Sequence, residues 1–169
     1  MVENVPCSDE TTVSEKADAL MFMGQFSHSL DEKGRLIIPS KYRDELGREF
    51  VVAAGYDTCL YAYSKAEWQR FAAEIEELPE KSRLNRMKRR RFLSSATDVE
   101  MDRQGRVLIP GFLRDAAKID KDIVIAGIGR KLEIWDKGLW EESLNSEEME
   151  AIAGGYDEED DDRPDTSSR

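Results

Sequence analysis

The chain has 169 residues, of which 40% are hydrophobic and 36% charged, a composition within the globular range. Its net charge of −11 lies at the ends, because residues 1–20 carry −4 and residues 141–169 carry −10. Residues 21–140 carry +3, so the overall acidity does not exclude a nucleic-acid partner. No run of 18 apolar residues is present, and the acidic first 20 residues are not expected to act as an export leader. A single histidine with two cysteines offers little for metal binding or catalysis. We expect a cytoplasmic protein that is not an enzyme. It should bind no cofactor, metal ion, membrane or small-molecule substrate.

A duplication dominates the sequence. Residues 30–39 (LDEKGRLIIP) and 101–110 (MDRQGRVLIP) share Asp, Gly, Arg, Ile and Pro at an offset of 71, and Arg43 falls on Arg114 at the same offset. At an offset of 72, Val52–Gly55 then falls on Val124–Gly127. A unit of roughly 50 residues buries little apolar surface alone, so the two copies are predicted to share one core.

Each copy is predicted to contain the same elements in the same order. In the first copy we expect strands and helices at Phe22–Leu30, Leu36–Ile38, Ser40–Leu46, Phe50–Ala54, Leu60–Tyr63 and from a capping box at Ser64 to Pro79. In the second copy we expect them at Ala96–Met101, Val107–Ile109, Ile123–Ala126, Leu132–Trp135 and after a capping Asp136. The short runs before each proline are predicted to be buried strands. Cys59, beside an apolar strand, is interpreted as a small buried residue.

These elements suggest five segments. Residues 21–78 form the first repeat, 79–95 a basic helical linker, and 96–153 the second repeat with a C-terminal helix. Residues 1–20 are predicted to be a disordered extension, an overcalled start or a cloning remnant, and 154–169 an acidic disordered tail. The linker has seven cations between Lys81 and Arg91, which fits either phosphate or tail binding or a merely solvated helix.

The paired turns are the candidate functional residues. Asp31 and Asp102 are each followed four positions later by an arginine, Arg35 and Arg106, with a glycine just before it. The carboxylate can accept hydrogen bonds from the turn and orient the guanidinium, which then suits the O6 and N7 acceptors of guanine. A salt-bridged turn without a ligand would show the same pattern.

Two further residue types complete each turn. Gly34 and Gly105 allow the positive φ that a tight turn needs. Lys33 and Arg103 are candidates for phosphate contacts, which supply affinity without sequence information.

Met21–Gly24, Asp31–Pro39 and Asp102–Pro110 together resemble the MraZ family of bacterial transcriptional regulators, of the AbrB/SpoVT group of DNA-binding proteins. The resemblance covers roughly residues 21–145. It implies an α+β, mainly β fold, in which two tandem AbrB/SpoVT-like swapped-hairpin β repeats form an intrachain pseudo-dimer with flanking helices. The family's functional motif falls on Asp31, Arg35, Asp102 and Arg106.

The resemblance also implies a function. It implies a homo-oligomeric ring, located at the nucleoid, that binds double-stranded DNA at G-rich direct repeats in its own promoter. There it would act as a repressor of the division and cell-wall gene cluster. The alternative is an antitoxin-like interaction scaffold that binds a protein through the acidic tail; the paired basic turns favour DNA.

Overall fold

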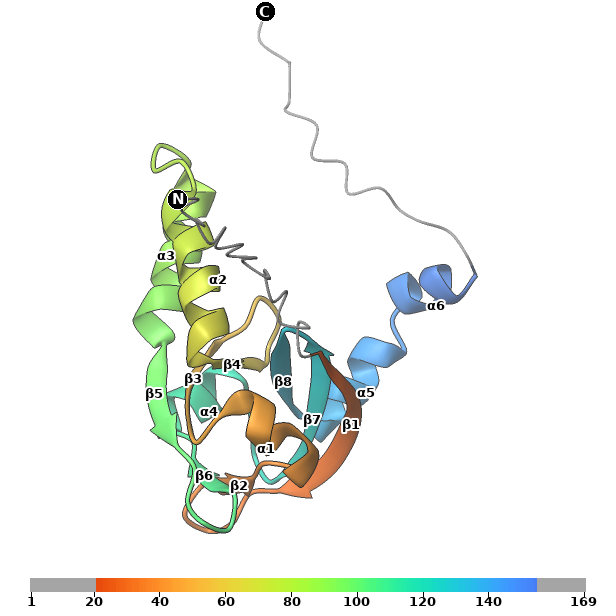
Figure 1. The fold of residues 1–169 in the computed structure, drawn as a ribbon. Helices are drawn as coiled ribbons and strands as arrows, with labels where there is room; N and C mark the ends of the chain where they lie inside the picture. The colour runs from red at the N-terminus through yellow and green to blue at the C-terminus, as the bar shows by residue number, and fades with distance from the viewer. Residues whose placement is uncertain (1–20, 155–169) are drawn as a thin grey trace, which may run out of the picture.

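The computed structural model describes residues 21–154, which form an α+β structure of two matching halves (Figure 1). The first half contains β1 (Phe22–Ser29), β2 (Arg35–Ile37), α1 (Ser40–Leu46), β3 (Glu49–Ala54), β4 (Leu60–Ser64), α2 (Lys65–Glu77) and α3 (Arg83–Ser95). The second contains β5 (Thr97–Glu100), β6 (Arg106–Leu108), α4 (Gly111–Ala116), β7 (Asp122–Gly129), β8 (Lys131–Asp136), α5 (Lys137–Leu144) and α6 (Glu147–Ala153). The predicted extension at 1–20 and nearly all of the predicted acidic tail lie outside the described residues.

Local sequence signals place these elements well. Helix α1 has the predicted bounds, and the Ser64 side chain accepts a hydrogen bond from the Glu67 N–H at the start of α2. The Asp136 carboxylate caps α5 as expected. The C-terminal helix of the second repeat is interrupted after Leu144, and α6 begins beyond a second cap at Ser146.

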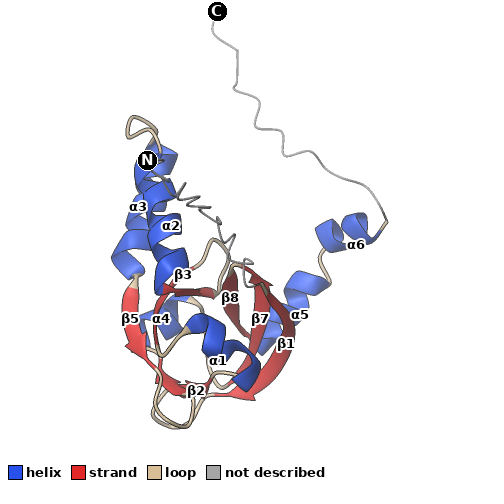
Figure 2. Ribbon diagram, viewed as in Figure 1, coloured by secondary structure: helices blue, strands red, loops and turns tan. Residues whose placement is uncertain are grey.

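The strands of the two halves are exchanged (Figure 2). The main sheet has the order β1-β7-β8-β4-β3-β5, so the first strand of each repeat pairs with the third strand of the other. The second strands, β2 and β6, pair with each other in a separate two-stranded ribbon, with Leu36 opposite Val107. All pairings are antiparallel. The predicted pair of tandem swapped-hairpin repeats is confirmed.

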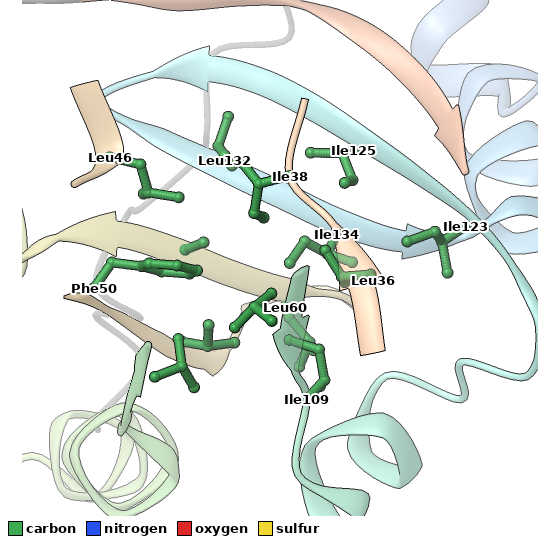
Figure 3. Close-up of a cluster of buried hydrophobic side chains, with 14 of the residues drawn as sticks. Leu36, Ile38, Leu46, Phe50, Leu60, Ile109, Ile123, Ile125, Leu132 and Ile134 are labelled. Atoms are coloured by element: carbon green, nitrogen blue, oxygen red, sulfur yellow. The ribbon is translucent and has the colours of Figure 1, made fainter. Parts of the chain in front are cut away.

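The inner strands β3, β4 and β7 of the main sheet are buried on both faces along most of their length, whereas β1 at its edge is mostly exposed. Along β4, Leu60 and Ala62 point into a cluster beneath the β2–β6 ribbon, whereas Tyr61 and Tyr63 point into an aromatic cluster on the other face. In Figure 3, Leu36, Ile38 and Ile109, from the ribbon and its flanks, lie close to sheet side chains such as Leu60 and Ile134. Both repeats contribute to both clusters, and this is the shared core that the duplication predicted.

The two short apolar runs are only half buried. Leu36 and Ile38 are enclosed, but Ile37 between them is 43% exposed, and Leu108 in β6 is 55% exposed. The prediction of fully buried strands was therefore wrong for these two residues. The ribbon packs on the core with one face only, and successive side chains of a strand point to opposite faces.

Some arginines of helix α3 donate hydrogen bonds to backbone carbonyls of the same chain. Arg89 donates hydrogen bonds to the carbonyl oxygens of Glu76 and Leu78 at the end of α2, and Arg91 donates to that of Gly55. These bonds satisfy carbonyls that a helix end and a loop leave free. Part of the basic segment thus stabilises the end of α2 and the β3–β4 loop, a structural role that neither sequence interpretation anticipated.

The half-buried ribbon predicts unequal effects for two adjacent isoleucines. Ile38→Ala should lower the free energy of unfolding by about 2–5 kcal/mol, because it leaves a cavity in the core. The matched change Ile37→Ala should cost less than about 1 kcal/mol, because its side chain is already partly in water. Urea denaturation of both variants measures the difference, and equal losses would contradict the assigned facing of β2.

Candidate nucleic-acid interface

The first turn is held by one carboxylate. Asp31 Oδ1 accepts hydrogen bonds from the backbone N–H groups of Lys33 and Arg35, both at 2.9 Å. Its Oδ2 accepts from Arg35 Nε at 2.7 Å. The Gly34 N–H closes the turn onto the Asp31 carbonyl oxygen at 3.0 Å, with a φ of +80° at Gly34. The turn thereby fixes the direction in which the guanidinium leaves the backbone.

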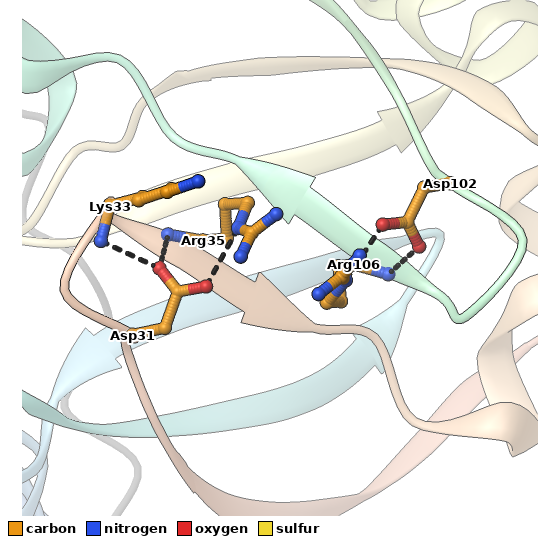
Figure 4. A network of polar contacts seen from close by, with 5 residues as sticks. All are labelled: Asp31, Lys33, Arg35, Asp102 and Arg106. Atoms are coloured by element: carbon orange, nitrogen blue, oxygen red, sulfur yellow. Dashed lines mark hydrogen bonds and ion pairs between the residues drawn. The ribbon is translucent and has the colours of Figure 1, made fainter.

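The second turn repeats this geometry. Asp102 accepts from the N–H groups of Gln104 and Arg106 at 2.9 Å and from Arg106 Nε at 2.7 Å. Gly105 also has a φ of +80°. Figure 4 shows the two Asp–Arg pairs on the two antiparallel strands of the ribbon. The structure therefore contains both predicted pairs, arranged about an approximate two-fold axis.

Hydrogen bonding keeps both carboxylates charged. The backbone N–H of Arg35 is the largest cause that lowers the pKa of Asp31 below its ordinary value, and the Arg106 N–H does the same for the pKa of Asp102. Both ion pairs are partly exposed, so their contribution to stability is small. What they supply is orientation, because the carboxylate binds the Nε–H, and within residues 21–154 the two terminal amino groups of each guanidinium make no hydrogen bond.

The outward face of the ribbon mixes arginine with aliphatic side chains. Arg35 lies opposite Leu108, and Ile37 lies opposite Arg106, so cations and apolar groups alternate diagonally. Lys33 and Arg103 are exposed on the flanking turns. Sequence reasoning had identified the cations but missed the exposed aliphatics, although their position two residues beyond each arginine placed them on the same face.

A second pair of arginines ties each turn to the other repeat. Arg43 Nε, on α1, donates to the carbonyl oxygen of Ile38 at 2.8 Å, and its guanidinium fills the space where a Cβ on Gly105 would be. Arg114, on α4, donates to the carbonyl oxygen of Ile109 at 3.1 Å, and a Cβ on Gly34 would lie 2.8 Å from its Cζ. Sequence reasoning gave these residues no role, although the repeat aligns them with each other.

Other chemical groups in residues 21–154 are used in packing. Cys59 is buried as predicted, and burial raises the pKa of its thiol to about 12, so the thiol stays protonated. No group of three or more His, Cys, Asp or Glu side chains in this range is placed to hold a metal ion. No helix in this range is long and apolar enough to cross a bilayer.

The fold and the site together define a class of protein: a duplicated swapped-hairpin β protein that displays two equivalent basic turns on one ribbon. Comparison with known proteins identifies the family. The family model for MraZ protein, whose description also calls it antitoxin-like, matches twice, at residues 21–91 and 92–157. The chain belongs to the MraZ family.

Curated relatives match most of the chain. A protein of Lachnoclostridium phytofermentans named transcriptional regulator MraZ is 48% identical over 133 residues, which cover 79% of this chain and 93% of the relative. Relatives of the same name from Thermoanaerobacter sp. and Pediococcus pentosaceus are 45% and 44% identical, over 82% and 76% of this chain and 98% and 90% of their own lengths. The sequence resemblance to this family is therefore confirmed.

The crossed arginines predict a coupling between Gly105 and Arg43. Gly105→Ala should destabilise the protein more than Gly129→Ala, because both glycines have positive φ but only Gly105 has a guanidinium in place of its missing side chain. The positive φ alone should cost about 1–2 kcal/mol at either position. Displacing Arg43 should add roughly 1 kcal/mol at Gly105.

Urea denaturation of a double-mutant cycle isolates this contact. In an Arg43→Ala background, Gly105→Ala should cost no more than Gly129→Ala costs in the wild type, since the clashing group is gone. If the losses of unfolding free energy caused by Gly105→Ala and Arg43→Ala simply add, the guanidinium of Arg43 does not stabilise the second turn.

Proposed function

We propose that this protein is a sequence-specific DNA-binding regulator of transcription, in which Arg35 and Arg106 read bases. The observation that carries the proposal is the pair of guanidinium groups held through Nε by Asp31 and Asp102 on the outward face of the ribbon. A guanidinium so fixed matches the O6 and N7 acceptors of guanine in the major groove.

The shape of the site supports this assignment. A two-stranded β-ribbon fits the major groove of B-form DNA, and β2–β6 is such a ribbon with one face turned away from the core. Ile37 and Leu108 are suited to contact thymine methyl groups beside the arginines. Lys33 and Arg103, on the turns at either end, are assigned to the phosphates that flank the groove.

Multiplicity supplies the specificity that one site lacks. A good arginine–guanine pair discriminates by about 1–3 kcal/mol, so several must act together. As the family resemblance implies, we propose that copies assemble into a ring and bind G-rich direct repeats spaced by roughly one helical turn. The proposed target is the protein's own promoter, in the division and cell-wall gene cluster, where an operator overlapping the promoter would give repression and a nucleoid location.

Removing either arginine should abolish most of the specificity. Arg35→Ala and Arg106→Ala should each weaken binding to the promoter fragment by about 10-fold to 100-fold, the equivalent of one base contact per protomer. Arg70→Ala, on the distant surface of α2, is the matched control and should bind like the wild type. Fluorescence anisotropy with the promoter fragment and a scrambled fragment, over a range of salt concentrations, gives the affinities.

Far-UV circular dichroism should show that all three variants stay folded, because the substituted side chains are not in the core. If Arg35→Ala and Arg106→Ala bind the promoter fragment as tightly as the wild type, the assignment of the turns is wrong.

An interaction scaffold is the second candidate, favoured by the antitoxin-like description of the family model and by the acidic sequence of the tail. Deleting residues 155–169 separates the two functions. A DNA regulator should keep or gain affinity for the promoter fragment, because anionic side chains compete with phosphate. A scaffold should instead lose its protein partner in a pull-down. A deletion variant that loses affinity for the promoter fragment would contradict the expectation that the anionic tail competes with phosphate.

A further inference from the structure

Among residues 21–154, helix α6 has no packing partner. It has seven residues, none of them buried, and its apolar side chains Met149 and Ile152 are 38% and 67% exposed. A helix this short is marginal in water unless an apolar face packs against another surface. The apolar side of α6 therefore needs a packing surface that residues 21–154 of its own chain do not supply.

The exposed face of α6 also has a definite charge. Met149 and Ile152 lie on one side of the helix with Glu148 on the flank beside Ile152, and Glu147 and Glu150 lie on the polar side. Leu144, at the end of α5, is exposed just before this helix. A surface that covers α6 should thus be apolar along its middle and positively charged along the margin beside Glu148.

Helix α3 carries such a surface. Leu84 and Met87 are 59% and 51% exposed, although the opposite side of the helix buries Phe92. Arg83 and Arg90 are exposed on the same side, and within residues 21–154 neither makes a side-chain hydrogen bond or ion pair. They differ in this from Arg86, Arg89 and Arg91, which donate to backbone carbonyls of their own chain.

The two surfaces cannot meet within one chain. Helix α3 packs against α2 and β3, whereas α5, which leads into α6, packs against β7 and β8. Figure 1 shows α3 beside the β3–β5 end of the sheet and α6 beyond the β1–β7 end. The charge and apolar pattern of each face fits the other, and a second copy of the chain brings them together.

We propose that α6 of one copy docks on α3 of a second copy, with Met149 and Ile152 against Leu84 and Met87. Glu148 then lies beside Arg83 and Arg90, which share one margin of α3, and Glu150 adds to the negative charge of α6. The contact joins unlike surfaces, so every added copy offers a free α3 or a free α6, and the assembly closes as a ring or continues as a filament. This inference deepens the homo-oligomer proposed above and gives its contact surface.

The docking leaves the DNA-binding face open. In Figure 1 the free ends of α2 and α3 project away from the β2–β6 ribbon, which lies at the other end of the molecule. Substitutions on α3 and α6 should therefore change assembly without removing Arg35 or Arg106 from the surface. Assembly and base reading can be tested separately.

Charge reversal on the full chain tests the contact. Arg83→Glu with Arg90→Glu, and separately Glu148→Arg with Glu150→Arg, should each weaken self-association at least about tenfold by placing like charges together. The fourfold variant with both pairs reversed should assemble again, because the charges are exchanged. Sedimentation velocity over a range of protein concentrations measures the association.

Lys118→Glu with Lys121→Glu is the matched control, since it makes the same change in net charge on exposed residues of the loop before β7. Its assembly should equal that of the wild type. Hydrogen exchange gives a second measurement: amides of residues 147–153 should be protected in the wild-type assembly and exchange rapidly in the Arg83→Glu/Arg90→Glu variant.

The outcomes separate the two proposals. Unchanged assembly in both charge-reversal variants, or failure of the fourfold variant to recover, would overturn the docking of α6 on α3 while leaving another homo-oligomer in place. A wild-type protein that stays monomeric at all concentrations would overturn the homo-oligomer together with the docking. Neither result alters the test of DNA binding by Arg35 and Arg106.

Discussion

The antiparallel pairing of β2 with β6 is the constraint on which the rest of this structure depends. It brings the turn of each repeat beside the helix of the other, where Ile38 N–H bonds to the Gly105 carbonyl oxygen and Ile109 N–H to that of Gly34. Arg43 and Arg114 then fill the spaces above the two glycines. Each turn is thus built partly from the other repeat, and one repeat alone lacks a complete site.

The Asp–Arg pairs matter for direction more than for energy. An exposed ion pair contributes little to folding, and both pairs are partly exposed. A carboxylate that accepts two backbone N–H bonds and one Nε–H bond nevertheless restricts a long side chain to one direction. Under the proposed function, an arginine ordered before binding loses less conformational entropy on contact with a base, which favours recognition by a ribbon that has few such arginines.

Sequence patterns that span only a few residues predicted the local part of this structure. The duplication, the cap at Ser64 and the turn at Asp31 are patterns over a few residues, and they indicated the elements and the candidate arginines. The partner of each strand could not be read in this way, because an apolar strand pairs equally well within its own copy or with the other. Arg43 was missed for this reason, since the glycine that it covers belongs to the other repeat.

The two turns carry their extra basic residue at different positions. Lys33 stands where the second repeat has Gln104, whereas Arg103 stands where the first has Glu32. A strictly two-fold reader matches palindromic DNA, because each half of the protein meets the same sequence. Two turns with equivalent arginines but differently placed cations for the phosphates distinguish, under the proposed function, the two directions of the duplex. Under the proposed function, this asymmetry lets every protomer of an oligomer bind direct repeats in one orientation.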